Sequence, residues 1–327
     1  MTSGEFVVAR SAEEWLARFG GQRRAVISVG NFDGLHIGHR QILASLIERA
    51  RKSANLAGVV TFEPHPLKVL RPQSAPPLIT TLVQRLAGFT QAGLDGALVL
   101  QFDAELSKLS PEEFAQKILV QALRTREILV GANFRFGHQH AGDVKLLKHI
   151  GAKDDFSVYV IEPVELNGLP VSSTRVRQAV LNARMEETAE LLGRPFALTG
   201  EIRRGAGRGA TMVFPTLNLA PEQELLPAPG VYASTSSLNE RIFRSVTNVG
   251  FRPTFDGSGL TIETHLLDFA ETITEGRLEV RFWKRLRDER RFSGPDQLRE
   301  QITRDIASAD AFFGKVAWQH SSLSTHT

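Results

Sequence analysis

Two histidines stand three residues apart in the decamer GNFDGLHIGH, residues 30–39, and this spacing suits the binding of phosphate. The decamer follows a short apolar run, 25–29, and precedes a stretch whose apolar residues recur with helical periodicity. A turn from a strand into a helix directs backbone N–H groups and the helix dipole at an anion. His36 and His39 lie at this turn, and Gly38 between them would let a phosphate approach the backbone. We predict a site for a nucleotide triphosphate that uses no Walker A loop; the alternative is a histidine-rich helix cap.

Three further segments follow predicted strands and carry side chains suited to a nucleotide and an aromatic substrate. FEPHP, 62–66, is a stiff loop with two prolines, and VGANFRFG, 130–137, offers an amide, aromatic rings and an arginine. SSTRVR, 172–177, opens a helix with hydroxyl groups, which bind phosphate together with backbone N–H groups. Each segment alone is typical of a turn or an N-cap. Their occurrence in order, each after a strand, indicates one binding site.

A second group of chemically capable residues lies in the last third of the chain. Four glycines crowd one loop and can form an anion-binding nest of N–H groups: Gly200, Gly205, Gly207 and Gly209. PTLN, 215–218, then presents a hydroxyl and an amide oxygen, which are hard ligands suited to Mg²⁺. Alternation along a predicted strand at 261–267 places Glu263 and His265 on one face. A carboxylate beside a phosphate loop can serve as general base for a hydroxyl, although a strand glutamate more commonly faces solvent.

Strand-like and helical stretches alternate in the first half of the chain. The strand-like runs are 25–29, 58–62, 97–102, 127–130 and 157–161, and the helical stretches between them include 40–51, 111–123 and 143–150. This alternation predicts a parallel sheet covered by helices on both faces. Ligands of such sheets bind at the carboxyl ends of the strands, where the segments described above lie.

Strand-like runs follow one another without helices after about residue 185. They are 197–202, 231–236, 241–249, 260–267 and 277–283. This pattern predicts an antiparallel barrel or sandwich. A last helix begins near Pro295 and carries an apolar stripe. We place the boundary near 182–187, which divides the chain into domains 1–184 and 185–327.

The composition sets the broad class of the protein. A length of 327 residues exceeds one typical core, which favours two domains. The chain has no cysteine, which excludes disulfides, thiolate zinc sites and cysteine nucleophiles. A net charge of +3 suits an anionic ligand without requiring nucleic acid. The chain shows no signal peptide and no apolar run near the roughly 20 residues of a membrane span, so we expect a cytoplasmic protein without membrane partners.

The four segments of the first half resemble the adenylyltransferase module of prokaryotic bifunctional riboflavin kinase/FAD synthetases. PTLN, NVGFRPTF (248–255), ETHLLDF (263–269) and LRDERRF (286–292) resemble the riboflavin kinase module of the same family. The resemblance implies an α/β plus all-β protein. Its N-terminal part would be a Rossmann-like nucleotidylyltransferase with a parallel sheet, and its C-terminal part a six-stranded Greek-key antiparallel β-barrel with a terminal helix.

The resemblance also implies activities, substrates and residue roles. ATP would phosphorylate riboflavin to FMN, and a second ATP would adenylylate FMN to FAD with release of pyrophosphate. His36, His39 and Glu263 would be catalytic, and Thr216 and Asn218 would hold Mg²⁺ with ATP. Nucleotide binding would involve Gly30, Phe32, Asp33, Gly38, Ser172, Ser173, Thr174, Arg177, Gly205, Gly207 and Arg208. Flavin binding would involve Phe62, Pro64, Asn133, Phe134, Phe136 and Arg287.

Departures from the family pattern leave alternatives open. The family usually has glycine before Phe-Pro-Thr, where this chain has Val213. One alternative therefore keeps an active adenylyltransferase beside a barrel that only binds flavin or regulates. Another is a nucleotidylyltransferase acting on a sugar phosphate or phosphopantetheine. A non-enzymatic alternative makes the Arg/Gly loop and the run 284–291 a nucleic-acid surface, which the interleaved acidic residues disfavour. The sequence leaves the oligomeric state open.

Overall fold

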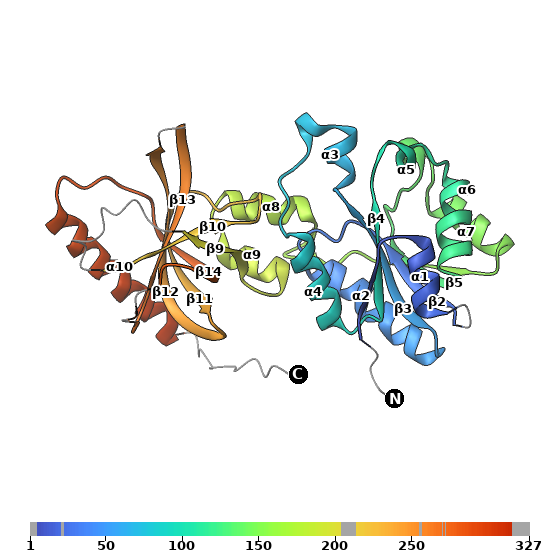
Figure 1. Cartoon of the computed structure of the whole chain (residues 1–327), viewed down its shortest axis with the longest axis horizontal. Coiled ribbons are helices and arrows are strands. Elements are labelled where there is room, and N and C mark those ends of the chain that lie inside the picture. The colour runs from blue at the N-terminus through green and yellow to red at the C-terminus, as the bar shows by residue number, and fades with distance from the viewer. Residues whose placement is uncertain are drawn as a thin grey trace. The chain divides into compact units, whose positions relative to one another are not determined.

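The computed structural model describes residues 5–20, 23–203, 214–254, 257–269, 271 and 273–315, apart from the side chains of 252–254 and 257–259. The chain divides into two compact units, Met1–Val176 and Arg177–Thr327. The division falls inside helix α8 (Ser173–Leu181). Figure 1 shows a sheet with helices in the first unit and a barrel with a long helix in the second.

The first unit is built on a six-stranded sheet with the order β1-β4-β3-β2-β5-β6, and every neighbouring pair is parallel. The strands are β1 (Val7–Ala9), β2 (Ala25–Val29), β3 (Leu56–Glu63), β4 (Gly96–Gln101), β5 (Thr125–Gly131) and β6 (Ser157–Ile161). This confirms the predicted parallel sheet. The chain runs outward from β2 in both directions, so the strand order switches between β2 and β5, which is the place where ligands of such sheets bind.

Helices cover both faces of this sheet (Figure 1). They are α1 (Ala12–Phe19), α2 (Ile37–Lys52), α3 (Pro66–Leu70), α4 (Leu82–Ala92), α5 (Ala104–Lys108), α6 (Pro111–Phe114), the π-helical continuation η2 (Ala115–Ala122) and α7 (Val144–Lys153), with short 3₁₀ turns η1 (Pro72–Ser74) and η3 (His138–His140) and a small hairpin of β7 (Glu165–Leu166) and β8 (Leu169–Pro170). One core holds Trp15 of α1 and Leu147 of α7. The other holds Leu46 of α2 and Phe89 of α4. The sheet is therefore held between two apolar cores, one on each face, and this packing fixes the positions of the loops that follow the strands.

The second unit contains a closed antiparallel barrel with the strand order β10-β13-β12-β11-β14-β9. The strands are β9 (Phe196–Arg203), β10 (Leu217–Pro221), β11 (Gly230–Leu238), β12 (Arg241–Thr254), β13 (Gly257–Leu266) and β14 (Arg277–Arg287), and the helices are α9 (Met185–Leu192) and α10 (Pro295–Lys315). β11, β12 and β13 form a meander, and β10 lies beside β13, which is Greek-key connectivity. The predicted six-stranded Greek-key barrel with a terminal helix is confirmed.

The barrel interior contains a line of hydroxyl groups, whereas an apolar patch on its outside binds α10. The hydroxyl of Ser234 lies 2.8 Å from that of Ser245 and 2.7 Å from that of Thr247, and all three residues are fully buried. Outside the barrel, Ala309 and Phe313 of α10 pack against the β11 and β12 side of the wall.

Candidate active sites

His36 is the N-cap of α2, and its imidazole is fixed by the helix that it begins. Its Nδ1 accepts a hydrogen bond from the backbone N–H of His39 at 3.3 Å, and the two rings stack with centroids 3.7 Å apart. Because Nδ1 is an acceptor, the proton of the neutral ring is on Nε2. Burial lowers the pKa of His36 to about 4, and burial, followed by the nearby His36, lowers the pKa of His39 well below its ordinary value. Both rings are therefore neutral hydrogen-bonding groups at neutral pH.

Gly38 and Phe32 fix the arrangement of the two imidazole rings. A Cβ on Gly38 would lie 3.2 Å from Nδ1 of His36, so the glycine makes room for the imidazole where the sequence predicted room for a phosphate. Phe32 is only 2% exposed, and its ring meets the ring of His39 edge-on at 5.3 Å and that of Phe89 at 5.5 Å. The ring of Phe32 therefore belongs to the core beneath the histidines. A Cβ on Gly30 would touch the same phenylalanine ring at 3.4 Å.

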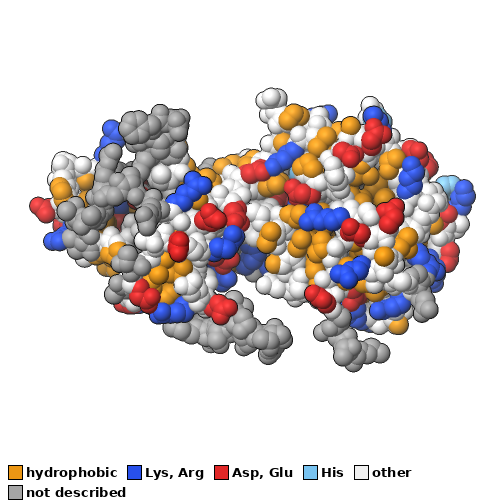
Figure 2. Space-filling view, viewed as in Figure 1, with side chains coloured by type: hydrophobic (Ala, Val, Ile, Leu, Met, Phe, Trp, Pro, Cys, Tyr) orange, Lys and Arg blue, Asp and Glu red, His pale blue; other side chains and the backbone are white. Residues whose placement is uncertain are grey.

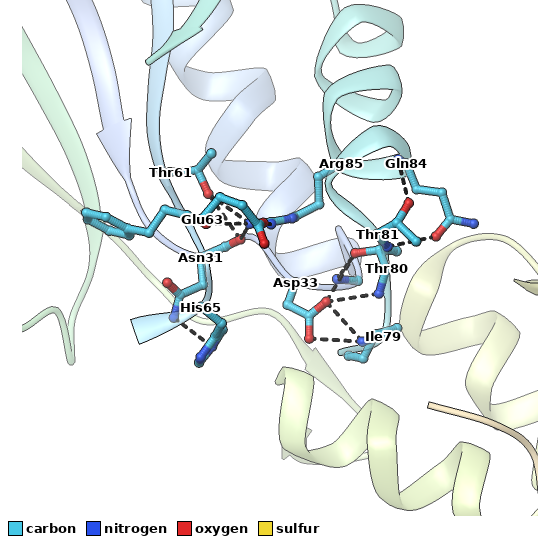
Figure 3. Close-up of polar contacts among 12 residues, drawn as sticks. Asn31, Asp33, Thr61, Glu63, His65, Ile79, Thr80, Thr81, Gln84 and Arg85 are labelled. Atoms are coloured by element: carbon cyan, nitrogen blue, oxygen red, sulfur yellow. Dashed lines mark hydrogen bonds and ion pairs between the residues drawn. The ribbon is translucent and has the colours of Figure 1, made fainter. Parts of the chain in front are cut away.

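Asp33 joins the decamer to two other segments. Its carboxylate accepts hydrogen bonds from the backbone N–H groups of Ile79 and Thr80, at 3.1 and 3.0 Å, and from the hydroxyl of Thr80 at 3.1 Å (Figure 3). Its backbone carbonyl accepts a hydrogen bond from the Ser173 hydroxyl at 2.9 Å. Asp33 is only 3% exposed. The carboxylate therefore fixes the loop of the decamer against the segment that contains Ile79 and Thr80.

The start of α8 lies against the decamer, as the order of the motifs predicted. The Ser173–Asp33 hydrogen bond makes this contact directly. Ser172 caps the helix, because its hydroxyl accepts a hydrogen bond from the backbone N–H of Arg175 at 3.3 Å. Thr174 is exposed and Arg177 is 9% exposed. Two helix N-termini, those of α2 and α8, therefore meet at the carboxyl end of β2.

The segment 62–66 contacts the decamer through an amide and an imidazole. His65 caps α3, and its Nε2 lies 3.1 Å from the side-chain amide of Asn31 (Figure 3). Phe62 is half-buried, and its ring meets that of Phe102 edge-on at 5.8 Å. Pro64 stands between these two anchored side chains. The predicted flavin loop is therefore fixed at both ends, and the decamer fixes one of them.

The loop after β5 presents one polar and one aromatic side chain beside the switch between β2 and β5. Asn133 is exposed, whereas the ring of Phe136 is only 6% exposed. Phe134 stacks on Phe136 with centroids 5.6 Å apart. Phe136 exchanges two backbone hydrogen bonds with Gly142, at 3.1 and 3.0 Å, which closes the loop at its base. Phe136 therefore supports the loop from the core, while Asn133 and Phe134 remain available to a substrate.

Arg85 of α4 is a site-building residue that the sequence analysis missed. It is 2% exposed, and its guanidinium donates to the carbonyl of Asn31 at 3.0 Å and to the hydroxyl of Thr61 at 3.1 Å. It also pairs with the carboxylate of Glu63 at 2.5 Å (Figure 3). A signal was present, because Arg85 shares the buried side of its helix with Phe89, four residues on. A charge at such a position predicts a buried partner.

Residues of the second group of chemically capable residues lie on three adjacent strands of the barrel. Glu263 of β13 is directly opposite Asn218 of β10 on one side and Asn248 of β12 on the other. Ile262 and Thr264 are buried, at 1% and 0% exposure, so the intervening Glu263 faces outward. Cross-strand partners in an antiparallel ladder share a face, so the two amides flank the carboxylate. The structure thus places Asn218 and Glu263 opposite each other on neighbouring strands.

His265 fixes the segment that leads into β10. Its Nδ1 donates a hydrogen bond to the carbonyl of Pro215 at 2.8 Å, and its ring meets that of Phe214 edge-on at 5.4 Å. Thr216, the next residue after Pro215, is exposed. The hydroxyl of Thr216 and the amide of Asn218 are oxygen donors of the kind that Mg²⁺ prefers. Across the described residues, no group of three His, Asp or Glu side chains forms a metal cluster.

Comparison with known proteins identifies both halves of the chain. A family model described as FAD synthetase matches residues 20–175, and one described as riboflavin kinase matches residues 192–313. A relative from Pseudomonas fluorescens, named bifunctional riboflavin kinase/FMN adenylyltransferase, is 39% identical over 290 residues, which are 88% of this chain and 93% of the relative. The chain belongs to the bifunctional riboflavin kinase/FMN adenylyltransferase family.

A second relative agrees with the assignment of the family, and one solved structure agrees with the fold. The bifunctional riboflavin kinase/FMN adenylyltransferase of Escherichia coli K12 is 37% identical over 294 residues, covering 90% of this chain and 94% of the relative. A crystal structure from Streptococcus pneumoniae, named a macrolide-efflux protein, superposes with a TM-score of 0.84 at 28% identity and covers 93% of this chain and 98% of its own. That structure shares the two-part fold of this chain, whereas the family models and the two curated relatives agree on flavin chemistry.

Three of the residues implied by the kinase resemblance, Gly205, Gly207 and Arg208, lie outside the described residues, as does Val213. Arg287 is described, and its guanidinium pairs with the carboxylate of Asp305 on α10 at 2.8 to 3.1 Å. Asp305 is only 4% exposed, so the arginine is held by the terminal helix. Arg287 is the last residue of β14, so this contact joins the end of that strand to α10.

In the described parts of the chain, no helix is long and apolar enough to cross a membrane. On the face shown in Figure 2, basic and acidic side chains are interspersed, without a large patch of one sign among the coloured residues.

Proposed function

We propose that this member of the family phosphorylates riboflavin with ATP to form FMN, and then transfers the adenylyl group of a second ATP to FMN, forming FAD and pyrophosphate. The main support for this proposal is that one chain contains two different sites. One is a neutral histidine pair where the strand order of the parallel sheet switches, and the other is a carboxylate flanked by two amides on a barrel. We assign the first step to a riboflavin kinase domain, residues 185–327, and the second to an FMN adenylyltransferase domain, residues 1–184.

In adenylyl transfer, the residues position two substrates and stabilise charge. The phosphate oxygen of FMN attacks the α-phosphorus of ATP while the bond to pyrophosphate breaks, so no covalent enzyme intermediate is needed. His36 offers its Nε2–H to the phosphates, and Nδ1 of His39 is buried without a hydrogen-bond partner among the described residues. Because the rings are neutral, they donate hydrogen bonds without binding the ground-state polyphosphate as tightly as a cation would.

The N-terminus of α8 would hold the leaving pyrophosphate. Ser172 and Thr174 are exposed at this terminus, and Arg177 follows within one turn. Backbone N–H groups at a helix start, hydroxyls and a guanidinium together neutralise the charge that develops on the β- and γ-phosphates. Ser173 contributes by holding α8 to the carbonyl of Asp33. Gly30, Phe32, Asp33 and Gly38 shape the loop beneath the nucleotide.

The flavin of FMN would lie between the loops after β3 and β5. Phe62 and Pro64 form one wall, and Asn133 and Phe134 form the other, supported by Phe136. Aromatic rings and an amide suit a flat heteroaromatic ring with polar edges. This placement is supported by the position of both loops at the carboxyl edge of the sheet.

In the kinase step, Glu263 would take the proton from the 5′-hydroxyl of riboflavin as that oxygen attacks the γ-phosphorus of ATP and ADP leaves. Asn218 and Asn248 flank the carboxylate and would orient it. Thr216 and Asn218 would hold Mg²⁺ with ATP, and the ion would neutralise the phosphate charge. Gly205, Gly207 and Arg208 are proposed from the sequence alone to bind the nucleotide, and Arg287 to border the flavin site.

We further propose that the protein acts in the cytoplasm on ATP, riboflavin, FMN and FAD, without a nucleic-acid or membrane partner. The mixed charges on the visible face (Figure 2) support a small-molecule enzyme over a nucleic-acid surface, because counterion release requires clustered cations.

A time course of flavins tests the proposed function. The purified protein is mixed with riboflavin, excess ATP and Mg²⁺, and the flavins are separated by chromatography. FMN that rises and then gives way to FAD is the expected result. FAD from added FMN, without FMN from riboflavin, would instead favour a barrel that only binds flavin. Turnover of a sugar phosphate or of phosphopantetheine without flavin turnover would refute the proposal.

A further inference from the structure

Arg85 reaches from the side of the sheet into the gap between two substrate loops. Its guanidinium contacts the carbonyl of Asn31 at 3.0 Å, in the loop after β2. The same group contacts the hydroxyl of Thr61 at 3.1 Å and pairs with Glu63 at 2.5 Å, both at the end of β3 (Figure 3). One side chain therefore ties together the loops that we assign to ATP and to FMN.

The helix that carries Arg85 is itself attached to the ATP loop. Thr81 and Gln84 form a capping box at the start of α4, with hydrogen bonds of 3.1 and 3.2 Å. The two residues before the cap, Ile79 and Thr80, hold the carboxylate of Asp33. Arg85 follows one residue after the capping box. The position of the guanidinium is thus set by the same loop that it contacts.

The two substrate loops also contact each other directly. The amide of Asn31 lies 3.1 Å from Nε2 of His65, the cap of α3 (Figure 3). Hydrogen bonds therefore run from Arg85 to Glu63, along the chain to His65, across to Asn31, and back to Arg85. Such a closed set leaves neither loop free to shift without breaking a buried contact.

Burial of Arg85 carries a free-energy cost that an apolar side chain would avoid. Its side chain is 3% exposed, and burial lowers the pKa of the guanidinium, an effect that the charges of Glu63 and Asp33 oppose. Replacing a buried ion pair by apolar residues of similar volume is often neutral or stabilising. Stability alone therefore does not account for an arginine at this position, whereas a requirement for fixed loop geometry does.

We propose that Arg85 is a positioning residue for adenylyl transfer, holding the loop 30–39 and the loop 62–66 at the separation that brings the FMN phosphate to the α-phosphate of ATP. Arg85 touches neither substrate and acts through Asn31 and Glu63. This role rests on the proposed function of the first domain. A misplacement of about 1 Å between reacting groups can lower a rate by about 100-fold, so loosening either loop reduces kcat.

Arg85→Lys keeps the positive charge but removes the planar guanidinium with its several N–H donors. Arg51→Lys is the matched control. Arg51 makes a two-pronged pair with Asp95, at 2.8 and 3.0 Å, beside the amino end of β4 and away from both loops. We expect Arg85→Lys to lower kcat for FAD formation from FMN by about 10- to 100-fold. ATP affinity, measured by calorimetry, changes less than about threefold, because Arg85 does not contact the nucleotide. Riboflavin phosphorylation by the same preparation stays at the level of Arg51→Lys.

Glu63→Gln and the double variant test whether Arg85 acts through Glu63. We expect Glu63→Gln to lower kcat for FAD formation, and Arg85→Lys combined with Glu63→Gln to be no slower than Arg85→Lys alone. If the fold-losses in kcat of the two single variants multiply in the double variant, Arg85 does not act through Glu63. If Arg85→Lys does not fold, judged by circular dichroism, Glu63→Gln decides the matter, and its wild-type kcat would overturn the proposal.

Two outcomes separate this proposal from the proposed function. Wild-type protein that forms no FAD from FMN and ATP would refute the adenylyltransferase assignment itself. Wild-type protein that forms FAD, beside Arg85→Lys with kcat within about twofold of Arg51→Lys, would refute only the positioning role.

Discussion

Nδ1 of His36 accepts a hydrogen bond from the backbone N–H of His39 at 3.3 Å, while the two imidazole rings stack 3.7 Å apart. One histidine thus caps the helix that carries the other. The cap needs a lone pair on Nδ1, so protonation of His36 at Nδ1 would break it. Helix geometry, ring protonation and phosphate binding are therefore coupled at this turn.

Stability of the first domain should fall as the pH falls through the histidine range. The pKa of His36 is about 4 in the folded protein against an ordinary value of 6.5. Between these values the unfolded chain binds a proton that the folded chain does not. The unfolding free energy therefore decreases from about pH 6.5 to about pH 4, by roughly 3 kcal/mol for His36. Burial of His39 acts in the same direction.

Urea unfolding near pH 7 and near pH 5 measures this dependence. Trp15, which is 2% exposed in the first domain, reports on it once the other two tryptophans are replaced by phenylalanine. His36→Asn is the control, because asparagine caps a helix but does not titrate. An unchanged pH dependence in this variant would contradict the assignment to His36.

His36→Ala should abolish FAD formation and leave FMN formation nearly intact. The substitution removes both the helix cap and the Nε2–H donor, and loss of a single transition-state donor lowers kcat by about 100- to 1,000-fold. The kinase site that we propose is in the other domain, on the barrel strands β10, β12 and β13. Flavin chromatography from riboflavin would then show FMN that accumulates. Loss of both activities in a folded variant would argue against separate sites.

Glu263→Gln should have the converse effect. The amide keeps the size of the side chain between Asn218 and Asn248 but cannot accept the proton of a hydroxyl. Riboflavin phosphorylation should fall by roughly 100-fold or more. FMN supplied directly should still become FAD at the wild-type rate. Phosphorylation of riboflavin at the wild-type rate would show that Glu263 is not the base.

His265→Ala should weaken the use of Mg²⁺ by the kinase. His265 donates to the carbonyl of Pro215 at 2.8 Å, next to the exposed Thr216. Loss of an outer hydrogen bond that orients a ligand typically costs 10- to 100-fold, so the Mg²⁺ concentration for half-maximal kinase activity should rise by about tenfold.

A Mg²⁺ titration of riboflavin phosphorylation measures this effect. His138→Ala is a matched control, because Nδ1 of His138 also lies 2.8 Å from a backbone carbonyl, that of Ser107, but in the first domain. The titration curve of His138→Ala should coincide with that of the wild type. Coincidence of the His265→Ala curve with both would exclude the positioning role of this histidine.

Local spacing in the sequence predicts most of the elements and the segments that carry chemistry. An apolar run followed by a helical period predicts a strand-to-helix turn at the decamer, and α2 begins at Ile37 as that turn requires. The sequence analysis predicts neither β1 nor β10, and β1 has only three residues, too few for a periodicity to stand out. The strand predicted at 241–249 continues to Thr254 as β12.

The sequence by itself determined which chemical groups are present and which turn or strand carries each, because these depend on spacings of two to four residues. Only the tertiary structure decided their partners. Asp33 is bound to Thr80, Glu263 stands opposite Asn218, and Arg85 joins β2 to β3. These pairings depend on strand order, barrel closure and register, which follow from packing of the whole core and leave no periodic trace in the sequence.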